Sequence, residues 1–336
     1  MNALTKYLNS TSNDVSATIC SGTYALPATA AVYNSSITSL TLSCCGNANS
    51  CIIDGGAAGS LPVIRTKTLF TFRQPTTLDI QGITFQNFDC PDCEGSLLTT
   101  EDSALTFKHN TVRKMKSLFV SSHCIIFVFK GMRKLTLPVP LYAFWPTFQY
   151  GALNIYRGKL VVIENCTFSD NLGWPAGAYI SSVAVLMNGN SFLRNRGRAG
   201  VCMEISDSLA VANCNKFEEN EAFDEFGNFV YGAVFYLYRS TVDAKLNIFM
   251  KNKVNGYGNG GAIKSDYSQL YLTSNTFTSN TAPDYGGAIE VTDSAIISNA
   301  DSFTNNTAYV SLFHMFLFQI ISLYQSLTDV VPCFPF

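Results

Sequence analysis

One phrase recurs along most of this 336-residue chain: a phenylalanine followed three residues later by an asparagine. Before each copy lie two short stretches in which apolar and polar residues alternate. Alternation with a period of two predicts short strands with one buried face. Because such strands are too short to stand alone, their repetition predicts coils stacked into a solenoid. The seven copies of the phrase are Phe107 with Asn110, Phe168 with Asn171, Phe192 with Asn195, Phe217 with Asn220, Phe249 with Asn252, Phe277 with Asn280, and Phe303 with Asn306.

A small pair, such as Gly260-Gly261 or Gly286-Gly287, precedes the alternating stretches. Its glycines recur after 23 to 32 residues, a length that fits one circuit of three short strands. We therefore predict an all-β parallel β-helix of about ten coils. In it Phe stacks on Phe inside, and Asn stacks on Asn at a bend, where it tolerates left-handed backbone angles and its amide bonds the next Asn.

The phrases Gly-Gly-Ala-Ile and Phe-x-x-Asn resemble the repeats of the polymorphic outer membrane proteins of chlamydiae and of eukaryotic right-handed β-helix proteins. The stretch CSGTYAL…SLTLSCCGNANSCIIDGG…TLDIQGITFQNF resembles the opening coils of pectin-lyase-like β-helices. The resemblance covers Thr18 to Ala308 apart from one insert, and it implies a right-handed, single-stranded parallel β-helix. This superfamily includes adhesins, lyases, hydrolases and epimerases, so the resemblance alone implies no single activity.

The sequence divides into a β-helix over residues 18–309 and flanking or inserted segments. Residues 1–17 hold Leu4, Tyr7 and Leu8 at helical spacing, which indicates a short capping helix or a frayed tail. Residues 120–149 and 310–336 carry no repeat phrase. The first is interpreted as a projecting loop, as a binding loop or lid, or as an unspliced intron, because it begins Val-Ser and ends Phe-Gln.

The off-repeat tail also begins with Val-Ser, which again indicates an unspliced intron. Whether or not the tail belongs to the protein, further coils after Ala308 are compatible with the repeat. Its apolar part, residues 310–324, is shorter than the ~20 residues of a membrane-spanning helix. A helix that covers the last coil is therefore favoured over a membrane anchor.

Charge and cysteine content limit the partners and the compartment. Charged residues make up 14% of the chain and the pI is about 5.9, so no nucleic-acid partner is expected. Bunched cysteines predict disulfides in an exported protein, with free thiols or zinc as alternatives: Cys20, Cys44, Cys45, Cys51, Cys90 and Cys93. Glycosylation sequons at Asn34, Asn165 and Asn305 agree with export. No signal peptide opens the sequence, which indicates either that the protein stays inside the cell or that its true amino terminus lies upstream of Met1. The expected extracellular or cell-surface location requires the second.

No catalytic constellation, cofactor motif or metal motif is visible. The carboxylates of catalytic type are Asp102, Glu204, Asp207, Asp243, Asp266, Asp284, Glu290 and Asp293. Asp102, Asp207, Asp266 and Asp293 occupy similar places beside a serine, which indicates turn residues rather than catalysts. His109 belongs to a Phe-x-x-Asn bend and is interpreted as a solvated turn residue.

The sequence thus predicts a non-catalytic, adhesin-like protein that binds or presents carbohydrate or protein partners. Tyrosines predicted to be exposed would stack on sugars or contact a protein: Tyr156, Tyr236, Tyr238, Tyr267 and Tyr271. The alternatives are a pectin-lyase-like lyase or glycoside hydrolase, and a structural spacer. An enzyme should show carboxylates or basic residues outside the repeat pattern that converge on one sheet face.

Overall fold

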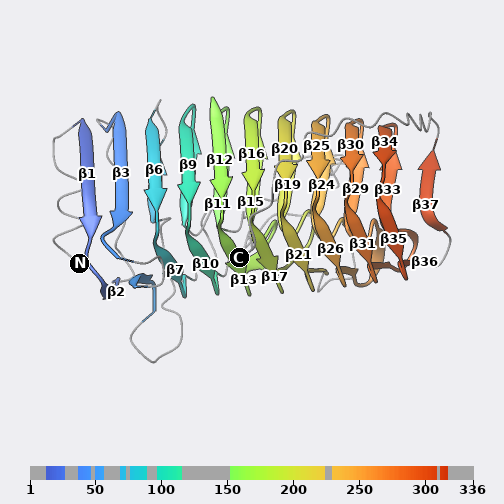
Figure 1. Ribbon diagram of the computed structural model, residues 1–336, viewed down its shortest axis with the longest axis horizontal. Coiled ribbons are helices and arrows are strands. Elements are labelled where there is room, and N and C mark those ends of the chain that lie inside the picture. Colours follow the sequence, from blue (N-terminus) through green and yellow to red (C-terminus); the bar gives the residue numbers. More distant parts are fainter. Residues whose placement is uncertain are drawn as a thin grey trace, which may run out of the picture.

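The computed structural model describes residues 13–26, 37–46, 50–56, 69–72, 76–88, 97–115, 152–223, 229–308 and 311–316. All the regular elements within these residues are β-strands, and they wind into a parallel solenoid. Figure 1 shows the strands of successive coils side by side along the long axis, in sequence order. The predicted all-β parallel β-helix of about ten coils is confirmed.

Sheet A is one long wall of the solenoid and holds one strand from each of ten coils. Its strands follow one another in parallel register, because a solenoid coil can pair only with the coils before and after it. They are β1 (Asp14–Ile19), β3 (Ser39–Cys44), β6 (Thr77–Gln81), β9 (Ala104–Lys108), β12 (Leu160–Glu164), β16 (Ala184–Asn188), β20 (Leu209–Asn213), β25 (Thr241–Lys245), β30 (Gln269–Thr273) and β34 (Ala295–Asn299).

Sheet B follows sheet A around each coil and also has ten strands. Most of these strands have only three residues, of which the middle one points into the core. They are β2 (Gly22–Ala25), β4 (Cys51–Asp54), β7 (Thr84–Gln86), β10 (Thr111–Arg113), β13 (Thr167–Ser169), β17 (Ser191–Leu193), β21 (Lys216–Glu218), β26 (Ile248–Met250), β31 (Thr276–Thr278) and β35 (Ser302–Thr304).

Sheet C closes the coil with nine strands. It carries the candidate site described below. Its strands are β5 (Phe70–Phe72), β8 (Leu98–Glu101), β11 (Leu153–Tyr156), β15 (Ala178–Ser181), β19 (Met203–Ser206), β24 (Phe235–Tyr238), β29 (Ile263–Asp266), β33 (Tyr285–Thr292) and β37 (Ser311–Phe316).

Two smaller sheets lie between sheets B and C along the coil path. A six-stranded corner sheet carries a glycine, alanine or valine in each strand, which keeps that corner narrow. The corner sheet consists of β14 (Leu172–Gly173), β18 (Arg196–Gly197), β22 (Glu221–Ala222), β27 (Lys253–Val254), β32 (Thr281–Ala282) and β36 (Thr307–Ala308). A separate pair consists of β23 (Phe229–Tyr231) and β28 (Tyr257–Asn259).

The structure revises the boundaries expected from the sequence. Because β1 begins at Asp14, residues 14–17 belong to the first coil rather than to a cap, while residues 1–12 lie outside the described part. Strand β10 pairs directly with β13, so the coils continue across the segment predicted as an insert. Residues 120–149 themselves lie outside the described part. Ser311–Phe316, in the tail expected to be off-repeat, pairs with β33 and extends sheet C, whereas residues 317–336 are not described.

Phenylalanine rings form a continuous stack inside the solenoid. Phe168, Phe192, Phe217, Phe249 and Phe277 are fully buried in consecutive strands of sheet B. Neighbouring ring centroids in this run lie 4.5 to 5.2 Å apart, with nearly parallel planes. Stacked aromatic pairs add roughly 0.5–1.5 kcal/mol each beyond the burial of their area. This row fixes the register of sheet B, because a slip of one residue would turn every ring outward.

An asparagine ladder runs beside the phenylalanine stack at the end of sheet B. The Oδ1 atom of Asn252 accepts hydrogen bonds from Asn220 N and Nδ2 at 3.1 and 2.9 Å. Its Nδ2 donates to Phe217 O at 3.1 Å and to Asn280 Oδ1 at 2.9 Å. The same pattern joins Asn171, Asn195, Asn220, Asn252, Asn280 and Asn306, over separations of 24, 25, 32, 28 and 26 residues.

The left-handed bend lies one residue before each ladder asparagine, not at the asparagine itself. Asp170, Arg194, Glu219 and Lys251 have φ values of 56°, 51°, 56° and 54°. The expected role of Asn in tolerating left-handed angles is therefore wrong at these positions. The amide serves instead to satisfy backbone groups that the corner leaves without strand partners.

The first predicted phrase does not belong to this ladder. Phe107 lies in sheet A and pairs with Ile163, while Val112 occupies the place opposite Phe168. Asn110 accordingly stands at the preceding corner, where its Oδ1 accepts from Ile83 N at 2.9 Å. Met115 takes the ladder place, and its N–H donates to Asn171 Oδ1. Phe107 is still buried and lies against Phe168, so the match in sequence concealed a shift in register.

Two further ladders were not anticipated. The first stands between sheets A and B and bonds Asn190, Asn215, Asn247, Asn275 and Asp301 in succession. A second, of serine hydroxyls, accepts from the backbone N–H one coil earlier, through Ser208, Ser240, Ser268 and Ser294. The first of these ladders is visible in the sequence, because each of its four asparagines and Asp301 precedes a stacked phenylalanine by two positions.

We expect Asn252→Ala to lower the free energy of unfolding by about 3 kcal/mol, because it leaves two donors of Asn220 without their acceptor and removes one hydrogen bond to the carbonyl of Phe217. Asn188→Ala is the matched control, since Asn188 is exposed on sheet A, and it should change stability by less than ~0.5 kcal/mol. Urea unfolding followed by circular dichroism measures both. Equal losses for the two variants would contradict the ladder's role.

Candidate functional site

The outer face of sheet C carries two rows of side chains that run along the solenoid axis. Residues between the rows, such as Ile155, Ile180 and Ile205, point into the core, so their neighbours point outward. The strands pair in register, and each coil therefore adds one side chain to each row. The first row is Asn154, Tyr179, Glu204, Tyr236, Lys264 and Glu290, and the second is Tyr156, Ser181, Ser206, Tyr238, Asp266 and Thr292. We call these two rows the sheet C face.

A charged cluster occupies the later coils of the sheet C face. Lys264 Nζ lies 2.7 Å from Asp266 Oδ1, donates to Thr292 Oγ1 at 2.6 Å and pairs with the Glu290 carboxylate. Thr292 Oγ1 in turn donates to Glu290 Oε1 at 2.8 Å. The side chains of Lys264 and Glu290 are only 6% and 4% exposed. Because buried charges need partners, these groups mainly satisfy one another.

Glu204 lies two strands earlier and has a different environment. Burial raises the pKa of its carboxyl from 4.5 to about 8. No neighbouring charge is needed to explain this shift, since burial is its cause. At neutral pH the group is largely a neutral acid that can donate a hydrogen bond. The residue as a whole is only half-buried.

Half-buried tyrosines flank Glu204 on both sides. The rings of Tyr156 and Tyr179 lie 5.3 Å apart, and Tyr236 stacks on Tyr231 at 5.6 Å. Burial raises the pKa of Tyr179 and of Tyr236, so both phenols stay protonated near neutral pH. The Asp266 carboxylate also raises the pKa of Tyr236, which places Tyr236 between Glu204 and the charged cluster.

Three of the eight carboxylates singled out in the sequence meet on this face: Glu204, Asp266 and Glu290. The others do not join them. Asp102, Asp207 and Asp293 stand at left-handed bends, as predicted for turn residues, with φ of 54°, 49° and 47°. Asp243 pairs with Lys245 on sheet A, and Asp284 accepts from Gly258 N. His109 also lies at an exposed bend.

Asp266 is the one carboxylate whose predicted role is wrong. The bend position in its coil is held by Tyr267, with φ 52°, so Asp266 is the last residue of β29 and pairs with Tyr238. The position of Asp266 in the strand could have been inferred from the sequence. An ungapped alignment of GGAIKSD with GGAIEVT places Asp266 opposite Thr292, and Lys264 opposite Glu290. Asp266 therefore departs from the repeat.

The five tyrosines singled out in the sequence lie in three places. Tyr156, Tyr236 and Tyr238 belong to the sheet C face, which Tyr179 joins without having been singled out in the sequence. Tyr267 is 58% exposed at a bend, and Tyr271 is on the outer face of sheet A.

The predicted cysteine and glycosylation sites are only partly described. Cys44 and Cys51 form a disulfide, whereas Cys20 and Cys45 are free and exposed. Asn165 and Asn305 are exposed at left-handed bends. Asn34, Cys90 and Cys93 lie outside the described residues.

Among the described residues, no group of three or more His, Cys, Asp or Glu side chains could hold a metal ion. The same part of the chain contains no helix that is long and apolar enough to span a membrane.

Comparison with known proteins finds one related family. Residues 147–314, half of the 336-residue chain, match the sequence model of a family described as the right handed beta helix region. No curated protein and no solved structure matches the chain. The matched segment contains all three carboxylates and all four tyrosines of the sheet C face.

The raised pKa of Glu204 predicts a pH dependence of stability. The folded state holds this proton up to about pH 8, whereas the unfolded chain releases it near 4.5. Stability from this group is therefore complete below pH 4.5 and falls as the pH rises toward 8, by at most ~1.4 kcal/mol per pH unit. Glu204→Gln should flatten this slope in denaturant unfolding between pH 5 and 8.

Glu219→Gln, at an exposed bend, is the control and should keep the wild-type slope. A Glu204→Gln variant whose stability still falls like that of the wild type would show that Glu204 does not carry the proton.

Proposed function

Because this chain belongs to the right-handed β-helix family, we propose that it binds a neutral carbohydrate on the sheet C face, without catalysis, outside the cell or at its surface. The observation that carries the proposal is the alternation of half-buried tyrosines with the neutral acid of Glu204 along the axis. An adhesin-like role, in which the solenoid displays this face, follows from the same arrangement.

The chemistry of the sheet C face favours sugars. Tyrosine has an apolar ring for the hydrophobic face of a sugar and a hydroxyl for its polar edge. Protonated Glu204 can donate to a sugar oxygen, and Ser181 and Ser206 add small polar groups in the second row. One side chain per coil, about 4.8 Å apart, suits an extended polymer that lies along the axis.

The charge of this face favours a neutral rather than an acidic sugar. Glu204 is largely neutral at neutral pH. The two carboxylates of Asp266 and Glu290 stand against the ammonium group of Lys264, and that group is already held by both of them. Within the two rows an anionic polymer would meet a net negative charge, and the ammonium group of Lys264 is not free to bind it.

One observation favours a second candidate, hydrolysis of a glycan. Glu204 has the raised pKa of a general acid, and Asp266 lies two strands away, about 10 Å along the axis. Inverting glycosidases place their two carboxyl groups roughly 6.5–9.5 Å apart, so side-chain movement toward each other would bring the pair into range. Two carboxyls in contrasting environments are the usual basis of acid and base assignment.

Binding to neutral oligosaccharides on a glycan array, followed by calorimetry on any hit, tests the first proposal. Tyr179→Ala and Tyr236→Ala should each weaken binding by about tenfold, because each removes a stacking surface. Tyr257→Ala is the control, since Tyr257 is 64% exposed and lies off the sheet C face. Variants that bind like the wild type, or binding only to proteins, would contradict a carbohydrate site here.

The same samples separate binding from hydrolysis. Incubation of each bound glycan with the wild type should release no new reducing ends. Release of reducing ends that Glu204→Gln abolishes would overturn the non-catalytic proposal and support the second candidate. Release that survives Glu204→Gln would contradict both.

Two exposed sequons and a disulfide support the proposed location. When the chain is passed through a eukaryotic secretory pathway, we expect glycans on Asn165 and Asn305, seen as a mobility shift that peptide-N-glycosidase removes. Asn165→Gln and Asn305→Gln should each abolish one step of the shift. A secreted chain with neither residue modified would remove this support.

A further inference from the structure

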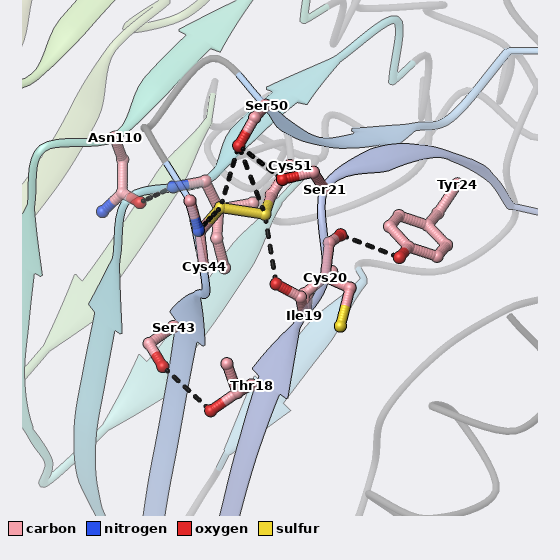
Figure 2. Close-up of a disulfide and its surroundings, with 12 residues drawn as sticks. Thr18, Ile19, Cys20, Ser21, Tyr24, Ser43, Cys44, Ser50, Cys51 and Asn110 are labelled. Carbon is pink, nitrogen blue, oxygen red and sulfur yellow. Dashed lines mark hydrogen bonds between the residues drawn. A yellow bond between two sulfur atoms is a disulfide. The ribbon is translucent and has the colours of Figure 1, made fainter.

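A cluster of four cysteines lies in the first two coils, and Figure 2 shows three of them, Cys20, Cys44 and Cys51. Cys44, at the end of β3, is bonded to Cys51 at the start of β4, which links sheets A and B within one coil. Cys51 Sγ also lies 3.2 Å from Ile19 O of the preceding coil. Cys20 and Cys45 belong to the same cluster, but their thiols are free and exposed.

The register of β1 and β3 brings Cys20 and Cys45 together. Ile19 pairs with Cys44, and Cys45 N donates to Ile19 O at 2.9 Å, so the next residues, Cys20 and Cys45, follow neighbouring positions. Adjacent parallel strands are about 4.8 Å apart, which lies inside the ~4.4–6.8 Å range of Cα separations in disulfides. A hydrogen bond between the two thiols raises the pKa of Cys20.

We propose that Cys20 and Cys45 form a second disulfide in an oxidising medium, and that this bond ties the first coil to the second. The proposal is independent of the carbohydrate site, because it depends only on the first two coils. In Figure 2 the Cys20 sulfur points away from the Cys44–Cys51 bond, so the second bond forms without exchange with the first.

Oxidised glutathione, a small disulfide, is a sufficient oxidant. The thiolate of one cysteine attacks a glutathione sulfur, which forms a mixed disulfide and releases one glutathione thiolate. The second cysteine, after losing its proton, attacks the protein sulfur of the mixed disulfide and releases the other glutathione thiolate. In total the two protein thiols lose two protons and two electrons, and one glutathione disulfide takes up both to become two glutathione thiols.

The position of the bond gives it a structural consequence. Strand β1 is the first strand of sheet A, and β2 is the first strand of sheet B. Within the described residues β1 pairs on one side only, with β3, and a strand paired on one side opens more readily than a strand in the interior of a sheet. A covalent bond between coils closes a loop of the unfolded chain and holds β1 in place.

The test uses the full chain, purified without reductant and equilibrated with oxidised and reduced glutathione at several ratios. Free thiols are then blocked with N-ethylmaleimide, and the protein is digested with chymotrypsin. Cleavage after Tyr24, Leu40 and Leu42 separates Cys20 from the peptide that holds Cys44, Cys45 and Cys51. Mass spectrometry should find these two peptides linked at oxidising ratios and blocked at Cys20 and Cys45 at reducing ratios.

Cys20→Ser and Cys45→Ser are matched variants at exposed positions, and each should abolish the link while the Cys44–Cys51 bond persists. The linked wild type should also resist limited proteolysis of its first coil at least about fivefold longer than either variant. The proposal is overturned if Cys20 and Cys45 remain fully blocked at the most oxidising ratio, or if the link survives in Cys45→Ser. Fragmentation that assigns Cys20 to Cys44 or Cys51 would overturn it as well.

Discussion

The amide of a buried asparagine at each corner is the interaction on which the solenoid depends. A coil that turns from one sheet to the next leaves backbone donors and acceptors without strand partners, and a buried unpaired group costs ~1–3 kcal/mol. The Asn252 side chain accepts from two donors of Asn220 and donates to Phe217 O and Asn280, so one residue meets the needs of three coils. Asn195, Asn220 and Asn280 bond in the same way, so coils separated by 24 to 32 residues are held at the same corner.

This rigid interior leaves the outer face of sheet C free to vary from coil to coil. Its first row changes from amide to phenol, carboxyl, phenol, ammonium and carboxylate, although the strands beneath remain in register. The Lys264 cluster meets its own electrostatic needs, whereas Glu204 is held protonated by burial alone. A polar group that the scaffold does not use is the kind that a ligand can use, which is why the candidate site centres on Glu204 and its tyrosines.

Much of the fold could be predicted from the sequence, because the repeat follows directly from it. Alternating residues, Phe-x-x-Asn and the coil length together indicate a parallel solenoid with stacked Phe and Asn, and the later copies follow this pattern. The first copy fails, because Phe107 and Asn110 match the phrase but lie in another sheet and at another corner. The sequence shows Glu204, Asp266 and Glu290 as carboxylates of catalytic type. It does not show that they lie on one face, because that depends on which strand positions pair between coils.

The sequence by itself determined the period, the buried phenylalanines and the amides that hold the corners, since each of these is a local pattern repeated in every coil. Only the tertiary structure decided which side chains share a face. In a strand, a shift of one residue turns a side chain to the opposite side, and Asp266 differs from the bend residues Asp207 and Asp293 by that single step. The burial of Glu204 also depends on the tertiary structure, because the stacked coils create the surroundings that raise the pKa of its carboxyl.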